Sequence, residues 1–108
     1  MFMSKDEESV LRKYRHQELL NMFRKVLTRI SNLKQSNFQI QTSANFYGDE
    51  FRFEITVFTY GGTNTSLTIY DFWDVKKSAK LIDGFIQAIK KGDFNAVEAA
   101  CKMKPTAW

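Results

Sequence analysis

His16 and Cys101 are the only histidine and the only cysteine of the chain, so they are the first residues to consider for chemistry. A histidine can serve as a general base or metal ligand, and a cysteine as a nucleophile where a base lies beside it. His16 follows a cluster of basic residues, and Cys101 falls on the apolar side of a predicted helix without a histidine nearby. We interpret His16 as a surface or boundary residue and Cys101 as a small core residue.

Four acidic residues, Asp49, Glu50, Asp71 and Asp74, could gather at one end of a sheet, where carboxylates would suit Mg²⁺. Simpler roles account for each, because two lie in a predicted turn and two at a strand end and a helix cap. The glycine pair at 61–62 lacks the spacing of a phosphate-binding loop and precedes a strand. We therefore predict no enzyme, no cofactor and no metal site.

The composition predicts one folded domain over residues 1–108, since 44% of the residues are hydrophobic and 26% charged. No apolar run approaches the roughly 18 residues of a membrane span, and the first fifteen residues are charged rather than apolar. A single cysteine fits a reducing compartment. We expect a cytoplasmic protein that makes no membrane contact.

A long N-terminal helix is predicted from a capping-box pattern at Ser4 and Glu7 to about residues 32–34. Its apolar residues recur at steps of three and four. At 1.5 Å per residue, about thirty residues make a rod of roughly 45 Å, which is longer than a small sheet is wide. One end of this helix should project or contact a second chain.

Alternating apolar and polar residues predict three strands, over residues 38–46, 51–58 and 66–72. Asp74 should cap a helix that ends at Gly92, and Asp93 should cap a shorter helix after it. The predicted fold class is α+β, a three-stranded antiparallel meander packed against helices in the order α-β-β-β-α-α. Gly84, inside the first of these two helices, marks either close packing or a tolerated weakness.

The alternation also predicts the register, because a slip by one residue would reverse every side chain. A four-residue loop over 47–50 places Phe46 opposite Phe51, and an odd second loop, for example 61–63, places Val57 opposite Leu67. The expected core face of the sheet then consists of Phe38, Ile40, Phe46, Phe51, Phe53, Ile55, Val57, Leu67 and Ile69.

The opposite face of the predicted sheet carries aromatic residues that would not ordinarily face water together. Cover by one of the chain's own helices is the simplest explanation, and self-association or docking of another protein are the alternatives. Stacking of nucleobases on these rings is disfavoured, because only one basic residue lies among them. We predict a small non-enzymatic module that binds another protein or forms a homodimer. The predicted partner-binding residues are Arg52, Phe58, Tyr60, Tyr70 and Phe72.

The distribution of charge supports an alternative function, nucleic-acid binding. The net charge of +4 lies entirely within residues 1–34, which carry eight bases and four acids. A solvated helix face that keeps the protein soluble explains the same distribution. The basic residues that would contact phosphates are Arg12, Lys13, Arg15, Arg24, Lys25 and Arg29 on the first helix, or Lys76, Lys77 and Lys80 on the second.

Residues 76–80, Lys-Lys-Ser-Ala-Lys, open the helix that follows the strands, and they resemble the KKxAK motif of double-stranded-RNA-binding domains. That family also runs α-β-β-β-α, and the resemblance implies that Lys76, Lys77 and Lys80 contact phosphates across a groove of the RNA. The element order is similar to that of a small phage anti-CRISPR protein, an inhibitor of a Cas9-type nuclease. This second resemblance implies a compact inhibitor or adaptor from a phage or mobile element.

Overall fold

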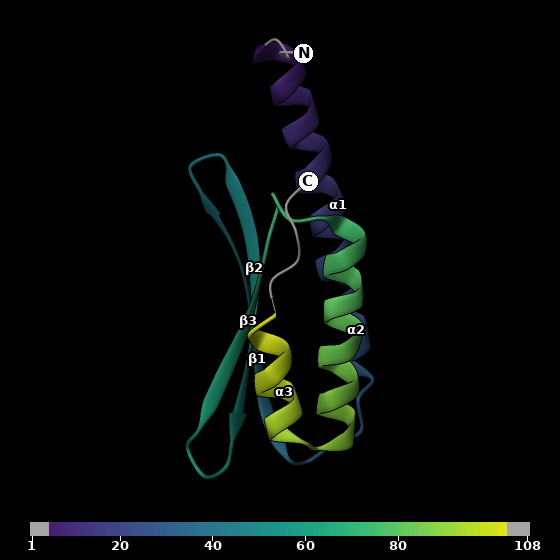
Figure 1. Cartoon of the computed structure of the whole chain (residues 1–108), viewed down its shortest axis with the longest axis vertical. Helices are drawn as coiled ribbons and strands as arrows, with labels where there is room; N and C mark the ends of the chain where they lie inside the picture. Colours follow the sequence, from purple (N-terminus) through teal and green to yellow (C-terminus); the bar gives the residue numbers. More distant parts are fainter. Residues whose placement is uncertain (1–4, 104–108) are drawn as a thin grey trace.

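One antiparallel sheet and three helices make up residues 5–103, the part of the chain that this computed structural model describes. Helix α1 (Lys5–Ser31) precedes strands β1 (Phe38–Tyr47), β2 (Glu50–Thr59) and β3 (Asn64–Tyr70). Helices α2 (Val75–Lys91) and α3 (Phe94–Cys101) follow. The strand order is β1-β2-β3, so the predicted α+β fold and its meander are confirmed (Figure 1).

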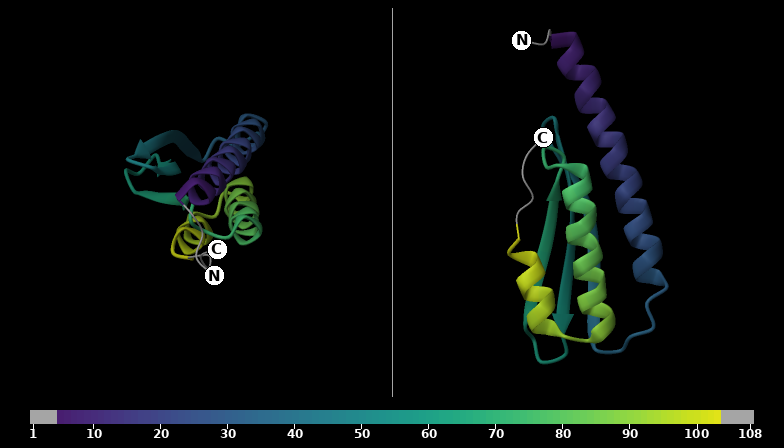
Figure 2. Two further views of the ribbon diagram at one scale, coloured as in Figure 1. Left: turned by 90° about the horizontal axis from the view of Figure 1, so that it is seen from above. Right: turned by 45° about the vertical axis from the view of Figure 1, so that its right-hand side comes forward.

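All three helices lie on the same side of the sheet (Figure 1). Helix α1 runs beside α2 and contacts β2, whereas α3 contacts β3. The N-terminal part of α1 extends beyond the sheet, as the right-hand view of Figure 2 shows, and the molecule measures 50 × 21 × 21 Å. The predicted projection of the long helix is therefore confirmed.

Helix α1 packs on the core with a narrow apolar stripe. Leu19 and Val26 are buried, and their seven-residue spacing, about two helical turns, places them on the same face. Leu20, Phe23 and Ile30 are partly buried around this stripe. The predicted cap at Ser4 lies outside the described residues, as do the side chains of residues 5–10 and 12.

The caps of α2 and α3 form as the sequence predicts. Asp74 accepts a hydrogen bond from the backbone N–H of Lys77 at 2.9 Å, and Asp93 accepts one from that of Ala96 at 3.1 Å. Gly92 ends α2 in the left-handed conformation with φ of 71°. Between these caps, α2 buries the apolar residues Leu81, Ile82, Phe85, Ile86, Ala88 and Ile89.

The register of β1 and β2 agrees with the prediction. Phe46 lies opposite Phe51, and Ala44 lies opposite Phe53. Pairing continues to Tyr47 and Glu50, so the loop consists of two residues instead of four. Gly48, the first of the two, has a φ of 61°, a value that glycine adopts without strain.

The register of β2 and β3 differs from the prediction by two residues. Leu67 lies opposite Ile55 instead of Val57, because the loop spans Thr59–Thr63. Hydrogen bonds hold this wider loop: the Thr59 N–H donates to the Thr63 carbonyl at 2.8 Å, and the two hydroxyls lie 2.6 Å apart. The loop length is still odd, so Leu67 remains on the buried face. Strand β3 therefore begins and ends earlier than predicted.

The expected core face forms over β2 and β3 but not over all of β1. Phe51, Phe53, Ile55, Val57, Leu67 and Ile69 are buried, as is Phe38 at the start of β1. Ile40 is half-buried, and Phe46 is 68% exposed, so the prediction that Phe46 belongs to the core is wrong. The helices contact β2 and β3, and the far end of the β1–β2 hairpin lies apart from α2 and α3 (Figure 1).

Candidate functional site

The outer face of the sheet, the one turned away from the helices, is open. Every described helix packs on the opposite side, so the expectation that a helix of this chain covers the outer aromatics is wrong (Figure 1). On this face the residues of β1 are exposed, and those of β2 and β3 are mostly half-buried by their neighbours within the sheet. A partner can therefore approach this face without displacing a helix.

The five predicted partner-binding residues do not form one site, because they lie near opposite ends of the sheet. Arg52 lies opposite Tyr70 near the β1–β2 turn, whereas Phe58 lies opposite Asn64 near the other end. At about 3.3 Å per residue, the six steps from Arg52 to Phe58 amount to roughly 20 Å. Tyr60 lies beyond Phe58 in the β2–β3 loop and is 77% exposed.

Three rings gather beside Arg52, and together these four side chains form what we call the aromatic patch, which consists of Tyr47, Arg52, Tyr70 and Phe72. The central carbon of the Arg52 guanidinium lies 3.7 Å from the ring centre of Tyr47 and 5.3 Å from that of Tyr70. The Tyr70 and Phe72 rings stack with centroids 5.1 Å apart and planes 28° apart. The patch is thus a continuous row of rings with one cation inside it.

Phe72 belongs to this patch although it does not lie on a strand. Strand β3 ends at Tyr70, and Phe72 falls in the turn that follows, where the N–H of Trp73 donates to the Tyr70 carbonyl at 3.2 Å. Trp73 packs edge-on against Tyr70 at 5.0 Å and so supports the row from the side. The prediction of Phe72 as a strand residue is wrong, yet the turn brings its ring onto Tyr70.

Arg52 is only partly satisfied within the described residues. One of its terminal nitrogens lies 3.3 Å from Oε2 of Glu50. Its buried Nε atom has no hydrogen-bond partner among residues 5–103. The Arg52 side chain is 27% exposed, so its terminal nitrogens can donate hydrogen bonds to a carboxylate or a carbonyl of a partner.

A polar strip separates the aromatic patch from the far end of the sheet. The Thr56 and Thr68 hydroxyls both donate to the Glu54 carboxylate, at 3.4 and 3.3 Å. The Thr56 hydroxyl also lies 2.8 Å from that of Ser66 on β3. The middle of the outer face is therefore polar and internally hydrogen-bonded, and the rings are confined to the two ends.

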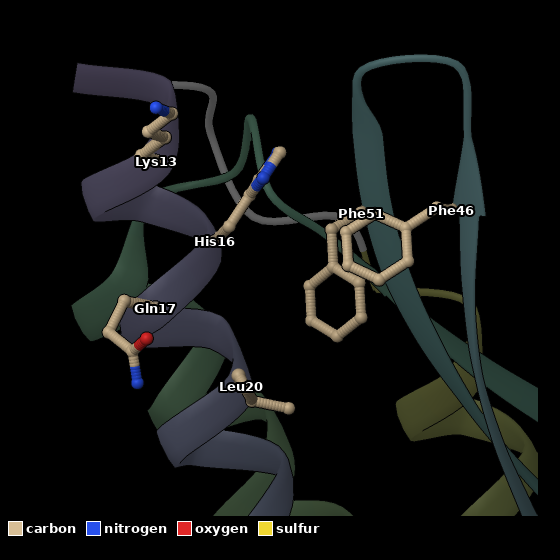
Figure 3. Close-up of a pocket in the computed structure, with 6 residues that line it drawn as sticks. All are labelled: Lys13, His16, Gln17, Leu20, Phe46 and Phe51. Atoms are coloured by element: carbon tan, nitrogen blue, oxygen red, sulfur yellow. The ribbon is translucent and has the colours of Figure 1, made fainter. Parts of the chain in front are cut away.

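On the helix side, an open cavity of about 360 Å³ lies between α1 and the β1–β2 hairpin. Figure 3 shows His16 and Leu20 projecting from α1 toward the hairpin, with Phe46 and Phe51 opposite. The His16 ring meets those of Phe46 and Phe51 edge-on, with centroids 5.9 and 6.2 Å apart. Lys13 and Gln17 complete the lining.

His16 is a boundary residue with a partner far away in the sequence. Its side chain is 22% exposed, and its Nε2 atom lies 2.7 Å from Oδ2 of Asp71. The same oxygen accepts a hydrogen bond from the N–H of Phe51 at 3.0 Å. Neither residue carries a local sequence signal for this contact, because only the packing of α1 against the sheet brings them together.

The predicted nucleic-acid-binding residues differ in their exposure. Arg29 pairs with Asp83 of α2, and Arg15 lines a second pocket together with Glu50, Asp71 and Phe72. The side chain of Arg12 lies outside the described residues. The exposed bases are Lys13, Arg24 and Lys25 on α1 and Lys76, Lys77 and Lys80 on α2.

The acidic residues occupy structural positions. Asp74 caps α2, and Asp71 joins β2 to the turn after β3. Within residues 5–103, no group of three or more histidine, cysteine or acidic side chains is arranged to hold a metal ion. In the same range, no helix combines the length and the apolar character that crossing a membrane requires.

Comparison with known proteins identifies no relative: no family model matches the chain, and no curated protein or solved structure is significantly similar to it. The resemblance of residues 76–80 to double-stranded-RNA-binding domains therefore stays a prediction.

Proposed function

We propose that this protein is a non-enzymatic module that binds another protein through the aromatic patch. The observation that carries the proposal is the position of Arg52 against the rings of Tyr47 and Tyr70, on a sheet face that no described helix covers. Tyrosine and arginine are among the residues that most often dominate the binding energy of protein interfaces. Rings already packed on one another also lose little side-chain entropy on binding.

The charge around the patch favours a protein over a nucleic acid at this site. Glu50 and Glu54 lie on β2 beside Arg52, so the patch carries no excess of positive charge for phosphates. Tyr47 and Phe72 are 56% and 45% exposed, which leaves apolar area for a partner to cover. The partner chemistry that fits is an apolar protein surface with a carboxylate or carbonyl for Arg52.

The sequence also predicts Phe58 and Tyr60 as partner contacts. Phe58 lies at the opposite end of the outer face, and Tyr60 lies beyond it in the β2–β3 loop. They are too far from Arg52 to belong to the same small contact. Tyr60 is therefore a matched control, since it is an exposed tyrosine of the β2–β3 loop that lies outside the aromatic patch.

Affinity capture from a native lysate tests the proposal. Tyr70→Ala and Arg52→Ala should each lose partners that the wild-type chain and Tyr60→Ala retain. Removal of a dominant interface residue costs about 2 kcal/mol or more, which corresponds to a roughly 30-fold weaker complex. Circular dichroism should show an unchanged fold in all variants. If Tyr70→Ala and Arg52→Ala retain the same partners, the aromatic patch is not the binding surface.

Nucleic-acid binding is a second candidate, which the exposed bases of α1 and α2 support. These two helices lie side by side, so Lys13, Arg24 and Lys25 are on a helix adjacent to the one that carries Lys76, Lys77 and Lys80. A complex through six phosphates should weaken by about 10³ between 50 and 200 mM salt. A complex through the aromatic patch should change little, and Lys76→Glu should leave it intact.

A cytoplasmic location is part of the proposal. Cys101 is the only cysteine and can form no internal disulfide, which suits a reducing compartment. Burial raises the pKa of the Cys101 thiol, and the protonated form that results is slow to oxidise.

A further inference from the structure

Strand β1 is an edge strand that lacks the usual protection of edges. It pairs with β2 alone, and every second residue turns its N–H and C=O groups toward the free edge. Natural edge strands are kept from pairing further by charges, prolines, bulges or short length. The ten residues of β1, Phe38–Tyr47, include no charged residue and no proline, and they pair with β2 without a bulge.

The other edge of the sheet differs. Strand β3 has seven residues, and α3 packs over it, so that its inward side chains Leu67 and Ile69 are buried. On β1, the inward residues Thr42, Ala44 and Phe46 are exposed, although they point to the same side as the core. The bare half of β1 therefore lacks cover on its face as well as on its edge.

A second copy, related by a two-fold axis through the middle of β1, would cover both the free edge of the strand and its exposed inward residues. This axis sets two copies antiparallel, so that the bare end of one strand lies beside the covered end of the other. Phe46 of one copy would then lie next to Phe38 or Ile40 of the second copy. These residues belong to the part of β1 that the helices already cover, and they extend the core toward Phe46.

Charge and hydrogen bonding also suit a second copy. The chain has a net charge of +4, yet β1 is uncharged, so two copies meet there without opposing like charges. Four of the five outward residues of β1 are neutral amides and hydroxyls, which both donate and accept and so complement a copy of themselves. They are Gln39, Gln41, Ser43 and Asn45.

We propose that two copies of this chain pair through β1, antiparallel, with the two-fold axis at Thr42 or Ser43, into one six-stranded sheet. A strand-to-strand contact falls at the small end of specific interfaces, so the dimer should dissociate at micromolar concentrations. Both outer faces then lie on the same side and carry two aromatic patches on one continuous surface. The dimer does not depend on whether a partner binds those patches.

Sedimentation over about a hundredfold range of concentration tests the dimer. The mass should rise from 12.6 kDa toward twice that value. Thr42→Lys should remain monomeric at every concentration, because it sets two ammonium groups near the axis while Thr42 is exposed in the monomer. Tyr70→Ala should dimerise like the wild type, which separates this contact from the aromatic patch. A wild-type mass of 12.6 kDa throughout would overturn the proposal.

Disulfide trapping locates the axis in a Cys101→Ser background. Residues that face their own copy across a two-fold axis lie within disulfide reach, so either Thr42→Cys or Ser43→Cys should form a covalent dimer under mild oxidation. Ser66→Cys on β3 is the matched control and should stay monomeric. Trapping through Ser66→Cys alone, or through neither β1 variant, would exclude pairing through β1.

Discussion

His16 on α1 lies with its Nε2 atom 2.7 Å from Oδ2 of Asp71, in the turn after β3. The Asp71 carboxylate also accepts the N–H of Phe51 at 3.0 Å, and the Asp71 N–H donates to the Phe51 carbonyl at 3.1 Å. One side chain therefore links the long helix, the central strand and the turn that leads into α2. The Asp71 side chain is only 10% exposed, so water cannot readily replace these partners.

Asp71→Ala should lower the free energy of unfolding by about 2 kcal/mol, because it leaves the Phe51 N–H without its carboxylate partner in a largely buried position. Asp83→Ala is the matched control, since Asp83 pairs with Arg29 while 61% exposed. Exposed ion pairs contribute about 1 kcal/mol or less. Urea denaturation of both variants measures the difference. Equal losses would show that Asp71 does not hold these elements together.

Substitution by alanine should have opposite effects on stability at two glycines, one within α2 and one directly after it. Gly92 has a φ of 71°, and a Cβ atom there would collide with the side chain of Asn37. Gly92→Ala should therefore lower stability by more than about 1 kcal/mol. Gly84 has open space where a Cβ would stand, so Gly84→Ala should raise stability by about 0.5–1 kcal/mol through helix propensity.

Thermal and urea denaturation of the two variants test this pair. The signs decide the outcome, because both substitutions add the same methyl group. A stabilising Gly92→Ala would mean that the left-handed cap is not required, and a destabilising Gly84→Ala would mean that a neighbour packs against that side of α2. The second result would restore the close-packing alternative that the sequence leaves open.

The register could be predicted from the sequence only where alternation and turn length agree. A four-residue loop at 47–50 predicts that Phe46 lies opposite Phe51, and the structure confirms this pairing. In the second hairpin, alternation determines which face a residue occupies but not a shift by two. Hydrogen bonds between Thr59 and Thr63 determine that shift, and periodicity carries no information on them.

The sequence predicts which face of the sheet the site residues occupy, but not which of them lie in contact. The sequence places Arg52 and Tyr70 on the outer face, but their pairing depends on the register of β3. The sequence places Tyr47 in the predicted turn, so it does not predict this residue as part of the site, although Tyr47 continues the outward alternation of Ser43 and Asn45 on β1. The core prediction for Phe46 failed because alternation gives a direction, whereas burial depends on whether a helix reaches that position.

Cys101 should make stability fall at alkaline pH. Burial raises the pKa of its thiol, repulsion from Glu98 adds to this effect, and a hydrogen bond with Thr65 opposes it. The folded chain therefore holds the thiol proton more tightly than the unfolded chain. This contribution is complete below the ordinary thiol pKa and is lost as the pH rises through the raised pKa. Urea denaturation at neutral and alkaline pH should show a smaller loss for Cys101→Ala than for the wild type, whereas equal losses would mean that the thiol is not protected by burial.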